Sequence, residues 1–340
     1  METNYKLIET KSLTIGYYHD KEKINIQDQL NLCLKKGEFC CLIGPNGVGK
    51  STLLLTISNQ IEAMQGDILI NTMPLKSIEP AVLSKSMSIV TTEPIQITNL
   101  KVIDLVEMGR FPYTNFWGKL TEEDDRIVHE SMQIMGIEEL ALRNYNELSD
   151  GEKQKTLIAK ALAQNTSIIL LDEPTAYLDF PSKVAILNDL KNIAHSKGIG
   201  IVLSTHDIEL ALKMADLIWL FPKNEKVISG IPEDLVIKND IQRIFTNEFL
   251  TFDLKTAHFT QIIKTRELIS ITDNSIEMEW LKRALLRKGI STSPSNNLEL
   301  KVHFNEKEKE FTLENNNSFK TFKSISEILQ EIETQIKNKI

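Results

Sequence analysis

The stretch that decides the fold is FCCLIGPNGVGKST, residues 39–52. It begins with a continuous apolar run, FCCLI, which is typical of a strand buried on both faces of a parallel sheet. The following GPNGVGKS fits the pattern G-x-x-x-x-G-K-[ST], and a helical run continues to residue 58. In such a loop the glycines let backbone N–H groups surround an anion, and the helix N-terminus adds its positive dipole end. The stretch therefore predicts a phosphate-binding loop.

The loop defines the first set of candidate site residues. We expect Lys50 to reach the β- and γ-phosphates of a bound nucleotide and the Ser51 hydroxyl to ligate Mg²⁺. The full set of candidate nucleotide contacts in this stretch is Gly44, Pro45, Asn46, Gly47, Val48, Gly49, Lys50, Ser51 and Thr52.

A second apolar run, residues 168–171, ends in Asp172 and Glu173. Acids at the carboxyl end of a strand lie at the sheet edge where ligands bind in open α/β sheets. On their own, two such acids are more often solvated loop residues, but the phosphate-binding loop upstream favours a functional role. We expect Asp172 to hold Mg²⁺ through water and Glu173 to polarise an attacking water, because phosphoryl transfer depends mainly on positioning and charge neutralisation.

The composition is that of a globular protein. The 340 residues include 39 basic and 47 acidic side chains, a net charge of −8, and 41% are hydrophobic. This acidic balance disfavours a generally basic nucleic-acid binder, so no nucleic-acid partner is expected. Apolar runs shorter than about 18 residues predict no membrane span, and the start of the chain lacks a secretory pattern. We expect a cytosolic location and no disulfide framework from Cys33, Cys40 and Cys41.

Glycine and proline usage changes near residue 250. Thirteen of the 14 glycines and nine of the 10 prolines lie before it. The earlier part alternates β-rich runs with helical stretches, which favours an α/β fold with a mostly parallel sheet. We predict an α/β domain at residues 1–255 and a separate domain at residues 262–340.

Three further motifs carry a family resemblance. LSDGEKQ, residues 148–154, resembles the LSGGQ signature of ATP-binding cassette (ABC) ATPases. PTAYLD, residues 174–179, resembles the D-loop and ends in Asp179, and STHD, residues 204–207, resembles the segment of the switch histidine, here His206. Tyr17 stands where the family stacks adenine on an aromatic ring, although the adjacent Tyr18 is an alternative. Together with the phosphate-binding loop and the acidic strand, these motifs follow the order found in the family.

The resemblance implies a fold and a mechanism. The fold is a RecA-like P-loop cassette with a helical subdomain at roughly residues 95–165. Two copies would close head to tail, each ATP lying between the phosphate-binding loop of one copy and the signature motif of the other. Ser149 and Gly151, with Glu152 beside them, would contact the γ-phosphate in trans, and His206 would contact it in cis. A serine at a helix N-terminus suits such an anion contact.

Two departures from the family pattern affect the expected activity. The signature has Asp150 and Glu152 where the family has Gly and Gln. The glutamine of the Q-loop is replaced by Thr92 or Glu93, depending on the alignment; either side chain has an oxygen that can ligate Mg²⁺ or its waters. The alternative to an active transport ATPase is a non-hydrolysing, or non-transport, nucleotide-binding module of the same family.

VEMGRFPY, residues 106–113, resembles the V-x-x-G-R-x-P-[HY] stretch of importer ATPases that serve iron–siderophore, haem and cobalamin uptake. This implies an ATPase subunit bound to an integral-membrane permease at the cytoplasmic face of the inner membrane, with a substrate-binding protein as an indirect partner. Four aromatic residues within 111–117 predict either a groove for a permease helix or packing under the helical subdomain.

The last residues show a pattern of their own. An apolar run precedes a helix that we expect to begin at Asn274, with Glu277 three residues later as in a capping box, and to end at Gly289. Alternating residues after it predict two paired strands, and an apolar stripe predicts a final helix that begins at Ser324. The expected order is β-α-β-β-α, a small α+β domain with both helices on one face of the sheet.

Overall fold

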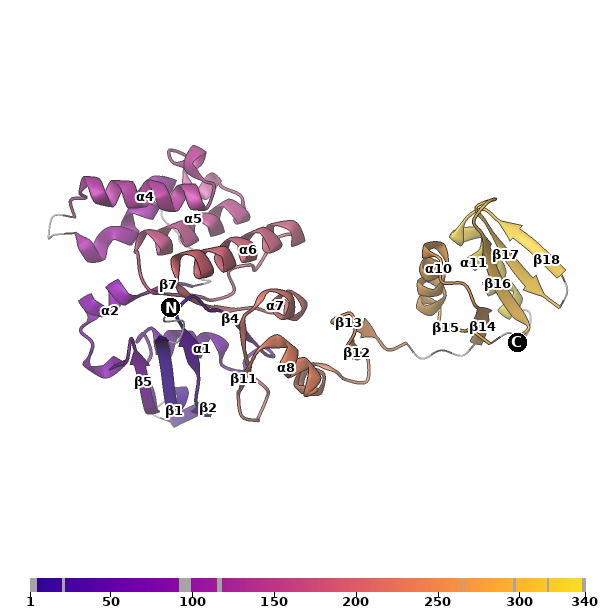
Figure 1. Ribbon diagram of the computed structural model, residues 1–340, viewed down its shortest axis with the longest axis horizontal. Coiled ribbons are helices and arrows are strands. Elements are labelled where there is room, and N and C mark those ends of the chain that lie inside the picture. Colours follow the sequence, from indigo (N-terminus) through magenta and orange to yellow (C-terminus); the bar gives the residue numbers. More distant parts are fainter. Residues whose placement is uncertain are drawn as a thin grey trace. The chain divides into compact units, whose positions relative to one another are not determined.

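The computed structural model describes residues 5–19, 22–91, 99–114, 118–263, 265, 267–295, 298–316 and 318–337. The chain forms two compact units. The larger unit extends to Thr246 and includes Phe252–His258, and the smaller unit contains Asn247–Thr251 and the residues from Phe259 onward. The ribbon in Figure 1 shows the elements of each.

A six-stranded sheet forms the centre of the larger unit, in the order β11-β10-β4-β9-β8-β7. Its strands are β4 (Phe39–Ile43), β7 (Met87–Val90), β8 (Ile168–Leu171), β9 (Gly200–Ser204), β10 (Leu217–Leu220) and β11 (Ile228–Gly230). Neighbouring strands are parallel except for β11, which is antiparallel to β10. Every residue of β4, β8 and β9 is buried, so the mostly parallel sheet predicted from continuous apolar runs is confirmed.

The first part of this unit, residues 6–74, also forms an antiparallel sheet, which the sequence did not predict. Its order is β2-β1-β5-β6, and β3 also pairs with β1. Its strands are β1 (Lys6–His19), β2 (Glu22–Leu30), β3 (Cys33–Lys35), β5 (Gln65–Ile70) and β6 (Met73–Pro74). The register of β1 shifts several times along its length, and such irregularities break the strict alternation that identifies a strand in sequence.

The helices of the larger unit connect these strands. They are α1 (Lys50–Ile57), α2 (Pro80–Ser86), α3 (Val102–Glu107), α4 (Glu122–Ile134), α5 (Asp150–Ala163), α6 (Phe180–Lys197), α7 (Ile208–Met214), α8 (Pro232–Ile237) and α9 (Asp240–Phe245). In Figure 1, α4 and α5 lie together on the side of the sheet away from β1 and β2, and α3 packs against both. This group is the helical part that the family resemblance implied.

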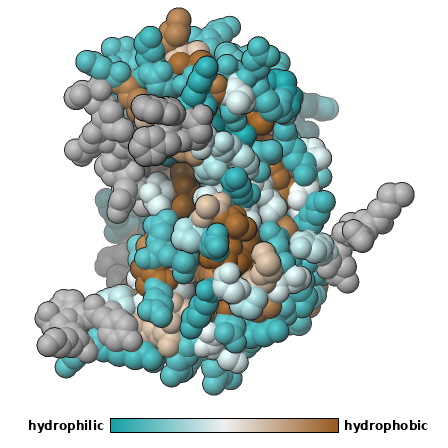
Figure 2. Space-filling model, turned by 90° about the vertical axis from the view of Figure 1, so that its left-hand side faces the viewer, coloured by the Kyte–Doolittle hydropathy of each residue, from teal (hydrophilic) through white to brown (hydrophobic). Residues whose placement is uncertain are grey.

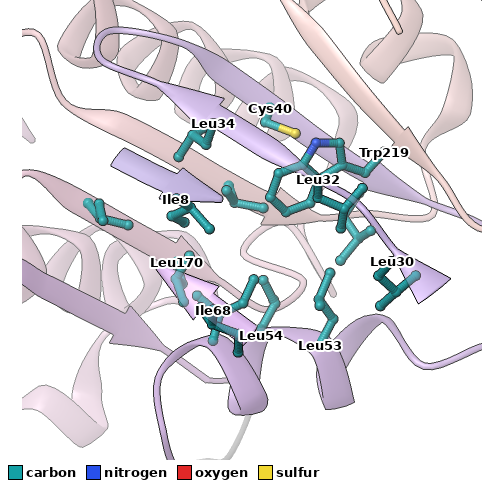
Figure 3. Close-up of a cluster of buried hydrophobic side chains, with 14 of the residues drawn as sticks. Ile8, Leu30, Leu32, Leu34, Cys40, Leu53, Leu54, Ile68, Leu170 and Trp219 are labelled. Atoms are coloured by element: carbon teal, nitrogen blue, oxygen red, sulfur yellow. The ribbon is translucent and has the colours of Figure 1, made fainter. Parts of the chain in front are cut away.

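The main core joins the two sheets and α1. Leu53 and Leu54 of α1 pack with Ile8 and Ile68 from the antiparallel sheet and with Leu170 from the central sheet, as Figure 3 shows. This packing holds the start of α1, and therefore the phosphate-binding loop, at a fixed place on the sheet. The face of the molecule seen in Figure 2 is mainly hydrophilic, with hydrophobic residues gathered near its middle.

The smaller unit is an α+β domain with a five-stranded sheet, in the order β15-β14-β16-β17-β18. Its elements are β14 (Glu267–Ile271), α10 (Ile276–Arg287), β15 (Ile290–Ser293), β16 (Leu300–Asn305), β17 (Glu310–Asn315), β18 (Ser318–Phe322) and α11 (Ile325–Lys337). Both helices bury their apolar side chains in one core against one face of the sheet, as predicted. A two-stranded pair, β12 (Leu250–Asp253) and β13 (His258–Gln261), precedes this domain.

Two details of this domain correct the prediction. The order β-α-β-β-α omitted β15 and β18, which are the two edge strands. The residue at the N-cap of α10 is Ser275, whose hydroxyl and N–H are bound by the Asp273 carboxylate, so Asn274 does not begin the helix. Gly289 does follow the helix end, with φ +74°.

Within the described ranges no helix is long and apolar enough to cross a membrane. The three cysteines are free, and Cys40 and Cys41 are fully enclosed in β4.

Candidate nucleotide-binding site

A cavity of about 710 Å³ lies over the phosphate-binding loop. Its lining residues come from the ends of β1 and β2, from the loop and α1, and from the segments that follow β8 and β9. They are Tyr17, Ile24, Ile26, Asn46, Gly47, Gly49, Lys50, Ser51, Thr52, Glu173 and His206. Candidate residues from four separate parts of the sequence thus meet at one site, at the carboxyl edge of the central sheet.

The loop holds its lysine in place. Lys50 Nζ donates hydrogen bonds to the carbonyl oxygens of Gly44 and Pro45, at 2.9 and 3.1 Å. Burial lowers the pKa of Lys50, and the carboxylates of Glu173 and Asp172 partly offset this effect. The ammonium group is therefore enclosed, oriented and close to the acidic pair.

Glycine is required at two positions of the loop. Gly47 and Gly49 have φ of +74° and +105°, which L side chains rarely adopt. A Cβ on Gly49 would also lie 2.6 Å from Cγ2 of Ile26. These conformations direct the loop around the cavity, and Gly49 is the N-cap of α1. Because glycine has no side chain, the backbone N–H groups at the start of α1 have no side-chain cap and are available to an anion.

The hydroxyl groups of Ser51 and Ser204 bind the two acidic residues. Ser51 Oγ lies 3.0 Å from Oδ1 of Asp172. Ser204, fully buried at the end of β9, donates from Oγ to the same Oδ1 at 2.6 Å and accepts from the Glu173 N–H at 2.9 Å. One hydroxyl therefore positions both the carboxylate of Asp172 and the backbone of Glu173.

Glu173 has an uncommon backbone conformation. Its φ is +49°, in the left-handed region that a glutamate rarely adopts. Its Oε1 contacts Nε2 of His206, whose segment follows β9. The conformation turns the carboxylate of Glu173 toward the cavity and the histidine, while Asp172 faces Ser51.

The signature motif lies at the start of α5, away from the cavity of its own chain. Ser149 is the N-cap: its Oγ accepts from the Glu152 N–H at 3.4 Å, and the Glu152 carboxylate accepts from the Ser149 N–H and hydroxyl, both at 2.8 Å. These hydrogen bonds lower the pKa of Glu152. Ser149, Gly151 and Glu152 line a second cavity of about 590 Å³, together with residues of α6. The glutamate that departs from the family pattern thus completes a capping box.

The remaining predicted residues are placed as follows. Asp179 is the N-cap of α6 and accepts from the Ser182 N–H at 3.1 Å. Tyr17 is 46% exposed and lines the nucleotide cavity. Thr92, Glu93 and the side chain of Tyr18 lie outside the part of the chain that the structure describes.

Two residues at the site were missed in the sequence. Ser204 belongs to the STHD motif, but the motif predicts a role for His206 alone. Gln27 is buried, and its Nε2 donates to the carbonyl oxygens of Val48 and Pro222, at 3.3 and 3.4 Å. Both act through partners distant in sequence, so no local pattern identifies them.

Comparison with known proteins agrees with this site. Residues 27–176 match the family described as ABC transporter, and residues 265–333 match the iron ABC transporter C-terminal domain. An uncharacterized ABC transporter ATP-binding protein, MJ0873 of Methanocaldococcus jannaschii, is 40% identical over 263 residues, which cover 77% of this chain and 87% of that protein. The petrobactin import ATP-binding protein FpuD of Bacillus anthracis is 36% identical over 243 residues, covering 72% and 88%.

Solved structures show the same cassette. A metal-chelate type ABC transporter in an inward-facing conformation superposes with a TM-score of 0.63 and 27% identity, covering 76% of this chain and 98% of that one. The dimeric structure of MJ0796, a bacterial ABC transporter cassette, gives a TM-score of 0.59 and 29% identity, covering 66% and 98%.

The phosphate-binding loop, the acidic strand end and the signature helix on this fold define an ATP-binding cassette. The chain belongs to the family of ABC transporter ATP-binding proteins. It is an ATPase subunit of a membrane transporter complex, and the fold and the activity implied by the motifs are confirmed.

Proposed function

We propose that this protein hydrolyses ATP to drive the import of an iron chelate, such as a siderophore complex, or of the chemically related haem or cobalamin. The main support for an iron compound as the transported ligand is the match of residues 265–333 to the iron ABC transporter C-terminal domain. The sequence VEMGRFPY and the similarity to a petrobactin import protein support it. The subunit would bind a permease at the cytoplasmic face of the membrane.

The geometry supports specific roles for the cavity residues. Tyr17 presents an aromatic ring at the mouth of the cavity for the adenine, and Lys50 with the backbone N–H groups of the loop binds the β- and γ-phosphates. The carboxylate of Glu173 orients and polarises the attacking water, and His206, in contact with Glu173, binds the γ-phosphate.

The residues fit a magnesium ion. Ser51 and Asp172 bring a hydroxyl and a carboxylate oxygen within 3.0 Å of each other beside the phosphate loop, and oxygen donors of this kind suit Mg²⁺. Mg²⁺ typically keeps several waters and takes the rest of its ligands from substrate phosphates, so two protein donors suffice. When bound, the ion neutralises charge on the phosphates.

We also propose that two copies form the active unit. Ser149 and Gly151 do not line the nucleotide cavity of their own chain. A second copy arranged head to tail would bring the N-terminus of its α5 to the γ-phosphate, with Asp179 near the same interface. The dimeric structure of the MJ0796 cassette supports this arrangement.

The uptake function has a direct test. Affinity purification of the tagged protein from detergent-solubilised membranes should recover a permease, and deletion of the gene should abolish uptake of a ⁵⁵Fe-labelled siderophore. Recovery of no membrane protein would contradict the transport role. A permease whose deletion impairs uptake of a different compound would contradict only the choice of ligand.

Ser204→Ala should lower kcat about tenfold and raise the Mg²⁺ concentration for half-maximal ATPase activity, because Asp172 and Glu173 lose their shared hydroxyl. Ser204→Thr keeps the hydroxyl, so its kcat and its Mg²⁺ dependence should both lie closer to those of the wild type. Ser88→Ala is the matched control, since Ser88 is a buried serine of β7 in the same sheet. An unchanged Mg²⁺ dependence in Ser204→Ala would show that Ser204 does not position the acidic pair.

Deletion of residues 262–340 should leave the affinity for ATP within about twofold of wild type, because the residues that line the nucleotide cavity all precede residue 210. The two units also have separate hydrophobic cores. Calorimetric titration of ATP against the truncated protein provides the measurement, with circular dichroism as the check on folding. A folded truncation that no longer binds ATP would contradict the separation of the two units.

A further inference from the structure

The segment Met108–Tyr113, a 3₁₀ helix, lies directly against the C-terminal part of α5. A Cβ built on Gly109 would be only 2.3 Å from the carbonyl oxygen of Lys160, so only glycine permits this approach. The next residue, Arg110, therefore leaves the backbone at a point in close contact with α5.

Arg110 is only 4% exposed, and its side chain links three elements. Its Nε donates to Oδ1 of Asp124 at 2.8 Å, and its Nη1 donates to the carbonyl oxygen of Ala163 at 2.8 Å. Asp124 lies in the first turn of α4 and also accepts from the N–H and hydroxyl of Thr121, the N-cap of that helix. Ala163 is the last residue of α5, where carbonyl groups lack helical partners. One guanidinium group thus joins the start of α4 to the end of α5.

The same guanidinium group also faces the surface segment. Its central carbon lies 4.0 Å from the ring centroid of Tyr113. Tyr113 is 37% exposed and Phe111 is 58% exposed, so two aromatic side chains reach solvent from the segment that Arg110 anchors. Exposed aromatic groups held on a rigid support are typical contacts for a protein partner.

The other end of α5 carries the signature motif. The helix has 14 residues, a length of about 21 Å, and its N-cap is Ser149. A displacement of the segment that contains Phe111 and Tyr113 would act through Arg110 on the end of α5, and the helix would carry it to Ser149.

We infer that Arg110 is a positioning residue that couples a partner bound at Phe111 and Tyr113 to the signature end of α5. This rests on the proposed function, in which that partner is the permease. A buried ion pair is weak support for stability, because apolar residues often replace such pairs without loss. The two hydrogen bonds from one planar guanidinium group instead fix the relative positions of three elements. A lysine has a single nitrogen and no planar fork with which to bind both acceptors in this way.

The test uses the complex that co-purifies with the permease, compared with the isolated subunit. Arg110→Lys should leave the ATP affinity of the isolated subunit within twofold and reduce permease-stimulated ATP turnover at saturating ATP about fivefold or more. Arg126→Gln is the matched control. Arg126 is an exposed arginine of α4 that forms ion pairs with Glu123 and Glu130 of the same helix. It should keep the full stimulation.

A second variant, which breaks the same connection from its other side, distinguishes loss of coupling from misfolding of Arg110→Lys. Asp124→Asn retains an acceptor for Thr121 and removes the charge that binds Arg110, and it should reduce the stimulation in the same way. Combined with Arg110→Lys it should add little, because both changes break one connection.

Three outcomes would overturn the inference. Full stimulation in folded Arg110→Lys and Asp124→Asn would show that the connection does not transmit coupling. Equal losses in the isolated subunit and in the complex would show a purely structural role. A wild-type protein that the permease does not stimulate would overturn the proposed function, and this inference with it.

Discussion

Glu173→Gln is expected to bind ATP with near-normal affinity and to turn it over about 10²–10⁴-fold more slowly than wild type, the range typical for loss of a general base. The amide keeps the size and shape of the side chain, but it has no negative charge and no longer polarises the water. Lys50, Ser51 and Asp172 are unchanged, so the phosphates and Mg²⁺ should still bind. With hydrolysis blocked, the ATP-bound dimer should accumulate and appear as a larger species in size-exclusion chromatography.

The matched control is Glu130→Gln, which changes an exposed glutamate of α4 that pairs with Lys197. It should retain wild-type turnover. Near-normal hydrolysis in Glu173→Gln, with no dimer in the presence of ATP, would refute the role of Glu173 and shift attention to His206.

Lys50→Ala should weaken ATP binding about 10–150-fold, equivalent to the roughly 1.5–3 kcal/mol of hydrogen bonds to a charged group. The side chain already lies in the loop with its ammonium group enclosed and oriented, so it contributes to binding without a large ordering cost. Isothermal titration calorimetry with ATP measures the change directly.

Lys197→Ala provides the comparison, because it removes an exposed lysine whose ion pair with Glu130 lies on helices outside the nucleotide cavity. It should leave the affinity unchanged. Because Lys50 also binds two loop carbonyls, thermal unfolding of Lys50→Ala should be recorded alongside. Unaltered ATP affinity in a folded Lys50→Ala protein would mean that the loop does not bind the phosphates as proposed.

The parts of the fold that the sequence predicted are those specified by local chemistry. The strand at residues 39–43 was predicted with its observed ends, because its run of apolar residues stops at Gly44. The phosphate-binding loop, Glu173 and His206 meet at one cavity because each follows a buried parallel strand, and parallel strands end at a common edge.

The parts that were missed depend on contacts between distant residues. The edge strands β15, with the sequence ISTS, and β18, with SFKTF, lack a clear apolar alternation, since they gain their place by pairing with an inner strand. Ser204 holds Asp172 and Glu173 only after β8 and β9 are side by side. The capping box of Ser149 and Glu152 is local, and its signature spacing S-x-x-E is present in the sequence.

The left-handed backbone of Glu173 has a consequence for how this sequence can change. Holding a glutamate at φ +49° costs about 1–3 kcal/mol of folding stability, which glycine at the same position would largely recover. With Glu173 in its proposed role, the most stable sequence for this backbone is not the one that hydrolyses ATP. Selection for thermal stability alone would favour replacement of Glu173. A screen for more stable variants of this protein must therefore also measure ATP turnover.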